Sequence, residues 1–323
     1  MTPDEIIRLV NRHNGVISYA AEEAGIPRTT MTDRYNAACR MTGAIPRRVM
    51  PRRAETPTVS RHNDYKEQVE HRTVFMSDPH IPYHSKTLTS LTTKVVEHIR
   101  PDLLVLGGDV IDARQISRFE QDPAHATDRL QCEIDEAVEV LTPMINASKR
   151  TVYLVGNHEW RLPAIINIVS GMFGLRVLEL PYLFQEAGLP PVEFRMGKAA
   201  KVVIGEGHGR CVMRHGTKYN IHVSWTVLQR EYPGCISIQG HSHRPDFKSL
   251  HADGRYGLAY VSGHLLDPLT GGDYLPDPGN DPWTPGIIIV DHYDNMTAAN
   301  VTQVIMTGDS VAVDGRVFRC DPQ

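Results

Sequence analysis

Four short clusters of the sequence combine aspartate, asparagine and histidine side chains in a way that suits metal chemistry. They are residues 76–80 (MSDPH), 107–112 (GGDVID), 155–159 (VGNHE) and 239–243 (QGHSH). Taken alone, each cluster is also compatible with an ordinary turn. Taken together, they supply oxygen and imidazole donors and no thiolate, which is the donor set that suits Mn²⁺, Fe or Zn²⁺. The combination therefore predicts a metal site built from several distant segments.

The elements that must position these clusters follow from the pattern around them. Strand-like apolar segments precede the clusters, and helical segments alternate with the strands. Expected strands cover residues 73–77, 103–106, 151–155 and 235–239, and expected helices cover residues 86–99, 128–147 and 222–231. From about residue 245, strand and turn signals dominate. We expect an α/β sandwich with helices outside its sheets, and clusters that meet beyond the carboxyl ends of the strands.

Two of the clusters place metal-binding side chains two positions apart. The pairs are Asp78 with His80 and His241 with His243. In an extended backbone, residues i and i+2 point to the same side. We therefore expect both members of each pair to point into the site.

The order of these motifs resembles that of the calcineurin-like metallophosphoesterase superfamily. The motifs are Asp-x-His, Gly-Asp-x-x-Asp, Gly-Asn-His-Glu, His-Gly and Gly-His-x-His, and the resemblance covers residues 73 to about 245. It implies two central sheets flanked by helices and a centre for two metal ions. By this resemblance the ligands of the first metal are Asp78, His80, Asp109 and His243, and those of the second are Asn157, His215 and His241. Asp109 would bridge the two ions.

The resemblance also implies hydrolysis of a phosphate ester with the help of two divalent ions. We expect Mn²⁺, with Fe or Zn²⁺ as alternatives. Such a pair activates water and neutralises the charge that develops during displacement at phosphorus. His158 matches the family's acid for the leaving group, and Asp112 matches the carboxylate that orients it. An imidazole beside a carboxylate can stay charged and give up its proton.

The His-Gly element occurs twice, as His208-Gly209 and as His215-Gly216. We favour His215, because residues 211–213 read as a strand that runs into it and a helix follows. His208, which has a glycine on each side, fits a hairpin turn before that strand.

Other side chains have weaker claims on the site. Arg161 could bind phosphate through a forked pair of hydrogen bonds, although a surface salt bridge fits equally well. His84 lies near the first ligands and could touch substrate, although a place at a helix start fits better. Tyr274 and Trp283 lie in a segment that we expect to cover the site, where they could stack on a base or pack in the core. We expect structural or exposed positions for His98, His125, His251, His264 and His292.

The amino-terminal part of the chain differs from the rest in charge. Residues 1–61 contain ten arginines and six acidic residues, a net charge of +4, whereas the whole chain has −4 and the remainder therefore −8. Residues 43–57 contain three prolines and show no helical or strand period, which is typical of an exposed linker. We expect a small domain at residues 1–45, a basic linker at 46–70 and the catalytic domain at 71–323.

The first of these segments resembles the helix-turn-helix family over about 20 residues. Small alanines would pack one helix, Gly25 would permit the turn, and the second helix would enter the major groove of DNA. The residues expected to contact DNA are Arg28, Thr29, Thr30 and Arg34 on that helix and Arg47, Arg48, Arg52 and Arg53 in the linker. Asp33 counts against this interpretation, because a carboxylate near phosphates is unfavourable. The alternative is a small three-helix bundle for self-association, which would make the chain a homodimer.

The expected partner of the basic segment is a polyanion. We therefore expect DNA to be the substrate and the chain itself to be a nuclease. A DNA-binding domain would raise the local concentration of DNA at the catalytic site. A small DNA-binding domain joined to such a catalytic domain resembles chains that bacteriophages and prophages carry. Alternatives are a phosphatase or phosphodiesterase for a small nucleotide or a phosphoprotein, and a DNA-binding regulator with a metal site. Protein phosphatases of the superfamily carry Arg-Gly after the second aspartate, whereas here Ala113 and Arg114 follow Asp112.

Composition narrows the class of protein further. With 41% hydrophobic and 22% charged residues the chain is typical of a globular protein. Its apolar runs, such as residues 103–106 and 287–290, are far shorter than the roughly 20 residues of a membrane span, and its first residues lack the pattern of a signal peptide. Five scattered cysteines predict neither a disulfide framework nor a cysteine zinc site. We expect a cytoplasmic location, in a bacterial host cell if a phage encodes the chain, and no membrane partner.

Overall fold

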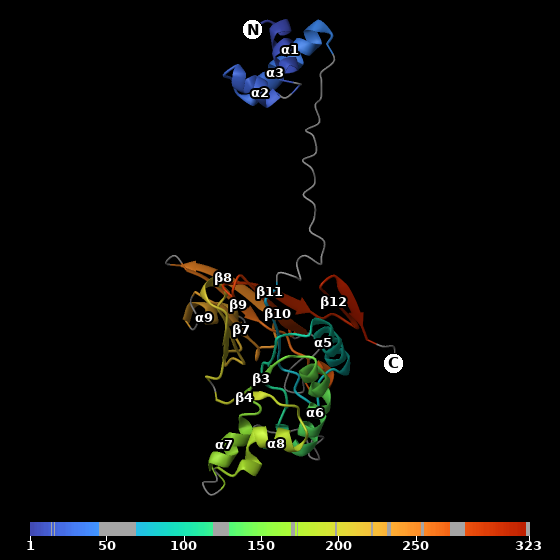
Figure 1. Ribbon diagram of the computed structural model, residues 1–323, viewed down its shortest axis with the longest axis vertical. Helices are drawn as coiled ribbons and strands as arrows, with labels where there is room; N and C mark the ends of the chain where they lie inside the picture. The colour runs from blue at the N-terminus through green and yellow to red at the C-terminus, as the bar shows by residue number, and fades with distance from the viewer. Residues whose placement is uncertain are drawn as a thin grey trace. The chain divides into compact units, whose positions relative to one another are not determined.

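In the computed structural model, contacts divide the chain into two compact units, Met1–Tyr65 and Lys66–Gln323 (Figure 1). The structure describes residues 1–13, 15, 17–44, 69–118, 129–168, 172, 174–197, 199–220, 222–230, 234–252, 255–271 and 282–320. The division falls inside the expected linker, residues 46–70, most of which lies outside the described residues. The expected domain boundaries therefore stay a prediction.

Within residues 1–44, its described part, the amino-terminal unit has three helices, α1 (Pro3–Arg12), α2 (Ile17–Glu23) and α3 (Arg28–Thr42). At the start of α1 the Thr2 hydroxyl accepts a hydrogen bond from the Glu5 N–H, and the Glu5 carboxylate accepts one from the Thr2 N–H. Gly25 lies between α2 and α3 with a φ of +64°, a left-handed conformation that glycine adopts without strain. The helices pack around Ile6, Leu9, Val10, Ala20, Ala21, Met31, Tyr35, Ala38 and Cys39.

The second unit is built on two large sheets. The first has six strands in the order β11-β10-β1-β2-β3-β4. β1 to β4 run parallel to one another, and β10 is antiparallel to both β1 and β11. The strands are β1 (His71–Met76), β2 (Leu103–Leu106), β3 (Thr151–Leu154), β4 (Glu193–Arg195), β10 (Gly286–Tyr293) and β11 (Ala298–Ile305).

The second sheet has five strands in the order β5-β6-β7-β9-β8. β6, β7 and β9 are parallel, and the edge strands β5 and β8 pair antiparallel with their neighbours. The strands are β5 (Val202–Ile204), β6 (Cys211–Arg214), β7 (Ile236–Gln239), β8 (Asp246–Ala252) and β9 (Arg255–Val261). A separate hairpin pairs β12 (Ser310–Val313) with β13 (Arg316–Arg319).

Inner strands of the first sheet, such as β1 and β2, are apolar on both faces because both faces are covered. Val74 and Met76 of β1 belong to the core that the first sheet shares with the helices, whereas Phe75 between them belongs to the core between the two sheets. The inter-sheet core also contains Leu103, Val105, Val152, Leu154, Val202, Cys211, Met213, Ile236 and Ile238. Double burial explains why β2 reads as an unbroken apolar run, LLVL.

Helices pack on the outer faces of the two sheets (Figure 1). α5 (Lys86–Ile99), α6 (Leu130–Asn146) and α8 (Leu180–Glu186) share a core with the first sheet, and α9 (Val223–Arg230) packs against β8 and β9. The remaining helical elements are α7 (Arg161–Ile168), α10 (Pro268–Gly271), η1 (Arg114–Ile116), η4 (Arg176–Leu178) and η5 (Gly207–Gly209). The predicted α/β sandwich of two sheets flanked by helices is thereby confirmed. None of the described helices combines the length and apolar character that crossing a membrane requires.

Candidate metal centre

The carboxyl ends of parallel strands from both sheets deliver the candidate ligands to one place. Asp78 and His80 follow β1, Asp109 follows β2, Asn157 follows β3, His215 follows β6, and His241 and His243 follow β7. Three overlapping groups have ligand atoms that all lie within 4.8 Å of one another: Asp78, His80 and His243; His80, Asp109 and His158; and Asp109, His215 and His241. Asn157 joins the third of these through His215. The structure therefore brings all seven candidate ligands together.

In the first group, which we call the first subsite (Asp78, His80 and His243), two imidazole nitrogens face each other. His80 Nε2 lies 3.2 Å from His243 Nε2, and His243 Nε2 lies 3.3 Å from Asp78 Oδ1. His80 Nδ1 lies 3.0 Å from an Asp112 carboxylate oxygen. An ionised carboxylate only accepts, so Nδ1 of His80 carries the hydrogen and Nε2 carries the lone pair. An ion at this place would find the Nε2 lone pair of His80, a second imidazole nitrogen and a carboxylate oxygen in one buried site.

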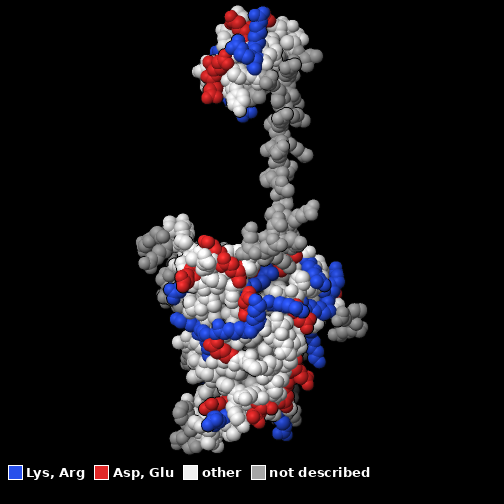
Figure 2. Space-filling view, viewed as in Figure 1, with Lys and Arg blue, Asp and Glu red and all other residues white. Residues whose placement is uncertain are grey.

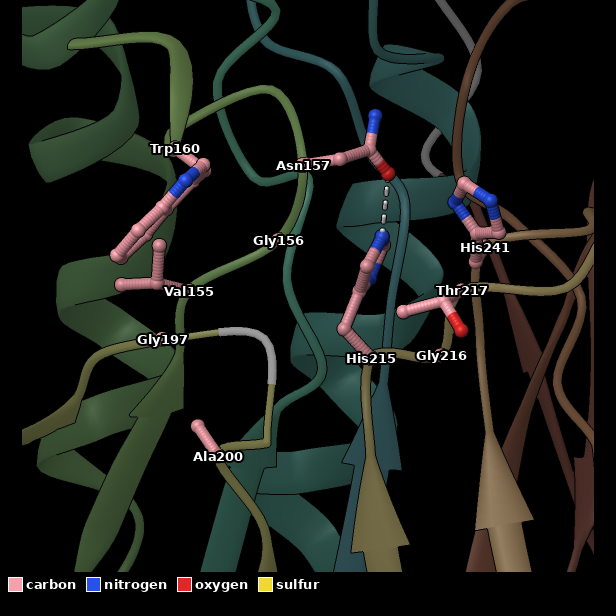
Figure 3. A pocket seen from close by; sticks show the side chains of 10 residues that line it. All are labelled: Val155, Gly156, Asn157, Trp160, Gly197, Ala200, His215, Gly216, Thr217 and His241. Atoms are coloured by element: carbon pink, nitrogen blue, oxygen red, sulfur yellow. Dashed lines mark hydrogen bonds between the residues drawn. The ribbon is translucent and has the colours of Figure 1, made fainter. Parts of the chain in front are cut away.

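In the second subsite (Asp109, Asn157, His215 and His241), three acceptor atoms converge. His215 Nδ1 donates to the Gly107 carbonyl oxygen at 2.9 Å, which leaves the lone pair on Nε2. This Nε2 faces Asn157 Oδ1 (Figure 3), 3.0 Å away, and lies 3.2 Å from Asp109 Oδ2. A proton can fill the same place: burial opposes the charge, but Asp109 outweighs burial and raises the pKa of His215 to about 10. The donors fit a divalent ion.

His241 and Asp109 link the two subsites. The backbone N–H of His241 donates to the Asp78 carboxylate at 2.9 Å. Burial, together with the charge of His215, lowers the pKa of His241 to about 4, so its ring is neutral and can offer a lone pair at neutral pH. Asp109 Oδ1 accepts from the His158 N–H at 2.8 Å, while Oδ2 faces His215. Its place between the subsites agrees with the bridging role that the resemblance implies.

His158 lies beside the subsites and is held by Asp112. His158 Nδ1 lies 2.8 Å from the Asp112 carbonyl oxygen and 3.1 Å from its carboxylate, while Nε2 lies 3.9 Å from Asp109 Oδ2. Burial disfavours the charged ring, but Asp109 and Asp112 prevail and raise the pKa of His158. Although burial acts in the opposite direction, hydrogen bonds from His158 and His80 hold the pKa of Asp112 well below its usual value. A charged imidazole here can give its Nε2 proton to an oxygen at the centre.

Arg161, for which phosphate binding and a surface salt bridge were both open, contacts the protein backbone. Its Nη1 donates to the carbonyl oxygens of Asp112 at 2.7 Å and Ala113 at 3.3 Å, and its Nη2 lies 3.2 Å from His158 Nε2. These contacts occupy part of the fork that a phosphate would need. Arg161 therefore ties the start of α7 to the loop after β2.

Glu159 holds the loop that carries Asp109, a role that we did not foresee from the sequence. This fully buried carboxylate accepts from the backbone N–H groups of Asp109 at 3.0 Å, Val110 at 2.5 Å and Ile111 at 3.3 Å. It also accepts from the Gly156 N–H and the Tyr153 hydroxyl, both at 2.9 Å. Burial, and next the charge of Asp109, raise the pKa of Glu159. Its place directly after Gly-Asn-His was the available sequence signal.

The backbone at the ligands is not extended, so the conformation expected for the Asp-x-His and His-x-His pairs is wrong. Five of the seven candidate ligands have a left-handed φ between +48° and +71°: Asp78, His80, Asp109, His241 and His243. Moreover, His241 and His243 turn to different subsites, whereas Asp78 and His80 share one. Such conformations cost of order 1–3 kcal/mol each and cluster at functional sites. They occur just beyond the ends of β1, β2 and β7.

Glycines beside the ligands allow this close approach. A Cβ built on Gly156 would collide with the Asp109 carboxylate, and one built on Gly240 would collide with the Ser77 hydroxyl and the Asp78 carboxylate. Neither position can carry a side chain while the ligands stay where they are. The glycines of the Gly-Asn-His-Glu and Gly-His-x-His motifs thus serve packing around the centre.

Several candidate residues lie elsewhere. His84 directly precedes Ser85, the N-cap of α5, and its Nδ1 lies 3.8 Å from Glu136, outside the subsites. His208 is exposed in η5 between the antiparallel strands β5 and β6, as expected, and His215 takes the place at the centre. On α3, Arg28, Thr29 and Arg34 are exposed and Thr30 is half-buried. The candidates Arg47, Arg48, Arg52, Arg53 and Tyr274 lie outside the described residues.

Two aromatic rings pack against His243 of the first subsite. The Trp283 ring lies 4.2 Å from the His243 ring, and the His264 ring lies 5.4 Å from it. His264 is fully buried, and burial lowers its pKa to about 3. The position of His264 is therefore structural, as expected, but beside a candidate ligand.

A cavity of about 430 Å³ opens beside the second subsite (Figure 3). One of its sides is formed by Asn157, His215, Gly216, Thr217 and His241, and the other by Val155, Gly156, Trp160, Gly197 and Ala200. Its volume is within the range of small-molecule sites. We did not foresee Trp160, which follows Gly-Asn-His-Glu directly.

Comparison with known proteins gives a family match. The model of the calcineurin-like phosphoesterase family matches residues 71–268, more than half of the chain. The curated proteins contain no significant match.

Similar solved structures include wild-type Vps29 from Entamoeba histolytica complexed with Zn²⁺, at 14% identity and a TM-score of 0.39, over 77% of this chain and 98% of that one. They also include Yfce, a phosphoesterase from E. coli, at 15% identity and a TM-score of 0.36, over 73% and 100%. A purple acid phosphatase from yellow lupin seeds shares 11% identity with a TM-score of 0.39, over 77% and 52%. At these levels the assignment rests on the family match, which covers the strands and loops that deliver all seven candidate ligands. The chain belongs to the calcineurin-like phosphoesterase family and is a metal-dependent phosphoesterase.

Proposed function

We propose that this phosphoesterase cleaves phosphodiesters with two divalent ions, and that its substrate is DNA. The observation that carries the two-ion proposal is the position of Asp109 between two groups of acceptor atoms, with His158 beside them. When bound, the ions supply Lewis acidity, which makes water a better nucleophile and neutralises charge on the phosphate oxygens. Mn²⁺ is our first choice, because the donors are oxygen and imidazole without thiolate.

In this proposal His158 completes the proton balance of the reaction. Water forms a new bond to phosphorus and gives up one proton to solvent. The bond between phosphorus and the leaving oxygen breaks, and that oxygen takes the proton from His158 Nε2, which solvent then restores. Asp112 accepts from Nδ1 of the same ring through its carbonyl and carboxylate oxygens, which fixes the ring so that Nε2 faces the centre. The charges of Asp109 and Asp112 favour the protonated form that an acid must have.

The preference for DNA rests on the amino-terminal unit. Arg28, Thr29 and Arg34 are exposed on α3, the second helix of the α2-turn-α3 pair, where a helix-turn-helix would meet DNA. Over residues 1–44, however, five arginines balance five acidic residues, so the excess positive charge comes from residues 45–61. Figure 2 likewise shows acidic and basic side chains together on the visible face of this unit. We therefore assign specificity to α3 and most of the phosphate attraction to the linker.

Cleavage assays test the reaction type. The full chain, stripped of metal and then supplied with Mn²⁺, should cleave bis(p-nitrophenyl) phosphate and both linear and supercoiled DNA, and a chelator should abolish both activities. The matched control is Asp109→Ala, which should cleave neither. Hydrolysis of p-nitrophenyl phosphate alone, without any diester or DNA, would instead favour the alternative of a phosphatase for a small nucleotide or phosphoprotein.

A binding assay tests the role of α3. In the Arg28→Ala/Arg34→Ala variant, DNA affinity should fall, and the slope of log affinity against log salt should become shallower by about one to two. Hydrolysis of bis(p-nitrophenyl) phosphate should not change, since neither arginine belongs to the metal centre. Arg8→Ala/Arg12→Ala removes the same charge from α1 and serves as the control. Equal losses in both variants would favour non-specific attraction, and no loss in either would favour self-association of the unit.

A further inference from the structure

The cavity beside the second subsite has two chemically different sides. Asn157, His215 and His241 on one side belong to the metal centre, and Thr217 adds a hydroxyl. The opposite side is apolar, formed by the side chains of Val155, Trp160 and Ala200 together with the backbone of Gly156 and Gly197 (Figure 3). A phosphate held by ions at the polar side would therefore present one of its ester groups to an apolar, aromatic wall.

The wall suits a flat ring. Trp160 is half-buried and packs against the core of the first sheet. The accessible part of its side chain lines the cavity. Ala200 is small, and a Cβ added at Gly197 would meet no atom within 4 Å, so the wall leaves room beside the indole. Aromatic side chains bind nucleobases by stacking, which works for every base because each has a π-face. The described residues of this wall offer no side-chain donor or acceptor apart from the indole N–H.

The position of His158 indicates which ester group enters the cavity. His158, the acid for the leaving oxygen in the proposed function, is not among the residues that line it. Its Nε2 lies 3.9 Å from Asp109 Oδ2, and its ring lies 4.5 Å from the His80 ring of the first subsite. The group that leaves therefore faces His158, and the cavity receives the group that stays on phosphorus.

We propose that this cavity is a nucleobase subsite, in which Trp160 stacks on the base of the nucleoside that remains attached to the phosphate. The inference rests on the proposed function and deepens it: the substrate is a nucleotide ester, not merely any phosphodiester. The subsite discriminates nucleosides from small alkyl groups and tolerates different bases, since stacking supplies most of the contact.

Two esters with the same leaving group test the subsite. Thymidine 5′-(p-nitrophenyl phosphate) and methyl p-nitrophenyl phosphate both release p-nitrophenol but keep a nucleoside or a methyl group on phosphorus. For the wild-type chain with Mn²⁺, the ratio of kcat/KM for the thymidine ester to that for the methyl ester should be at least about ten, which corresponds to one stacked base. Trp160→Ala should bring this ratio close to one, while Trp160→Phe should keep most of it.

Further variants guard against a loss of folding. Ala200→Leu places its extra atoms in the cavity from the same apolar wall and should lower the ratio about as much as Trp160→Ala. Trp225→Ala removes a 39% exposed tryptophan of α9 that does not line the cavity, and should leave the ratio unchanged. Melting temperatures of all variants show whether each is folded.

The outcomes separate the subsite from the proposed function. If the wild-type chain cleaves both esters with a ratio near one, or if folded Trp160→Ala and Ala200→Leu keep the wild-type ratio, the subsite is refuted and the diesterase stands. If the wild-type chain cleaves neither ester, the proposed function fails. The nucleobase subsite is then tested by comparing the affinities of two phosphate monoesters. Thymidine 5′-monophosphate should then bind about tenfold tighter than methyl phosphate to the wild-type chain but not to Trp160→Ala, and equal affinities would refute the subsite as well.

Discussion

The Nε2 atoms of His80 and His243 lie 3.2 Å apart, although 163 positions separate the two residues in the sequence. His80 follows a strand of one sheet and His243 a strand of the other, so this contact joins the two sheets at the centre. The Nε2 atom of His80 has a lone pair, because its Nδ1 donates to Asp112. Two buried nitrogens in this arrangement, with the Asp78 carboxylate 3.3 Å from one of them, form a ready place for a cation.

Asp112 should influence catalysis through the two histidines that it contacts. Asp112→Asn removes the negative charge next to Nδ1 of His80 and of His158, so kcat should fall by about 10²-fold and metal affinity by about 10- to 100-fold. The pKa of His158 should fall too, because this charge raises it. Since an acid works only while protonated, the alkaline limb of the pH profile of kcat should move to lower pH.

The control for this variant is Asp102→Asn, which removes a carboxylate that pairs with the exposed Lys149. It should leave the pH profile in place. An alkaline limb at the same pH in Asp112→Asn as in the wild-type chain would show that Asp112 does not set the protonation of His158.

Glu159 should be required both for stability and for metal binding. In Glu159→Gln, an NH₂ group replaces one oxygen of a carboxylate that faces five donors, so at least one buried N–H loses its acceptor. Each such loss costs about 1–3 kcal/mol of unfolding free energy. Because three of the donors belong to the loop of Asp109, the metal content should fall as well. Denaturant unfolding and metal analysis measure the two effects.

Glu193→Gln gives the matched control, because Glu193 pairs with Arg150 and Arg195 at the surface. Its unfolding free energy should change little, as exposed ion pairs contribute about 0–1 kcal/mol. Equal stability and equal metal content in the two variants would contradict the role assigned to Glu159.

Metal binding should compete with a proton on His215. Asp109 raises the pKa of His215 to about 10, despite burial, so the metal-free chain carries this proton at neutral pH. A cation needs the same Nε2 lone pair, and lowering the pH therefore weakens binding: affinity should rise by up to about tenfold per pH unit up to this pKa. Calorimetry in buffers of different ionisation enthalpy should detect about one proton released by this residue. His215→Asn should remove that proton, and an unchanged proton count would refute the assignment.

His158 should matter for turnover but not for metal content. His158→Ala should retain both ions and lose about 10²- to 10⁴-fold in kcat on DNA, the usual contribution of a positioned acid. The loss should be smaller for p-nitrophenyl esters, because p-nitrophenolate departs without needing a proton. Asp109→Ala, in contrast, should lose metal. Metal analysis and kinetics on both substrates measure this, and an equal loss of metal in the two variants would remove the acid role from His158.

Much of the fold could be predicted because strongly apolar segments have few alternatives. α5 and β2 have the expected bounds, residues 86–99 and 103–106, and α6 and α9 lie within the expected ranges. The convergence of the clusters also followed from sequence, since strand ends of parallel sheets collect polar residues at one edge. The expected linker and the DNA contacts assigned to it fall outside the described residues and stay predictions.

The parts of the centre that the sequence did not reveal depend on backbone geometry and on packing. The periodicity of a sequence carries no information on a left-handed φ. The extended backbone predicted for the two pairs of ligands was therefore wrong, although the ligands themselves converge. The role of Glu159 could not be read from the sequence, because its carboxylate binds backbone N–H groups, which nearly every residue has, so no partner side chain marks the contact. Trp160 lines a cavity together with Gly197 and Ala200, which come from a distant part of the chain, so its placement is set by tertiary structure.

Crystals of the full chain soaked with Mn²⁺ test the central claim most directly. Anomalous diffraction should show two Mn²⁺ ions per chain, one within reach of Asp78, His80 and His243 and the other within reach of Asn157, His215 and His241, with Asp109 between them. A separation of about 4 Å would fit two-ion catalysis at phosphorus. A single ion at saturating Mn²⁺, or two ions of which one lies away from these side chains, would contradict the account.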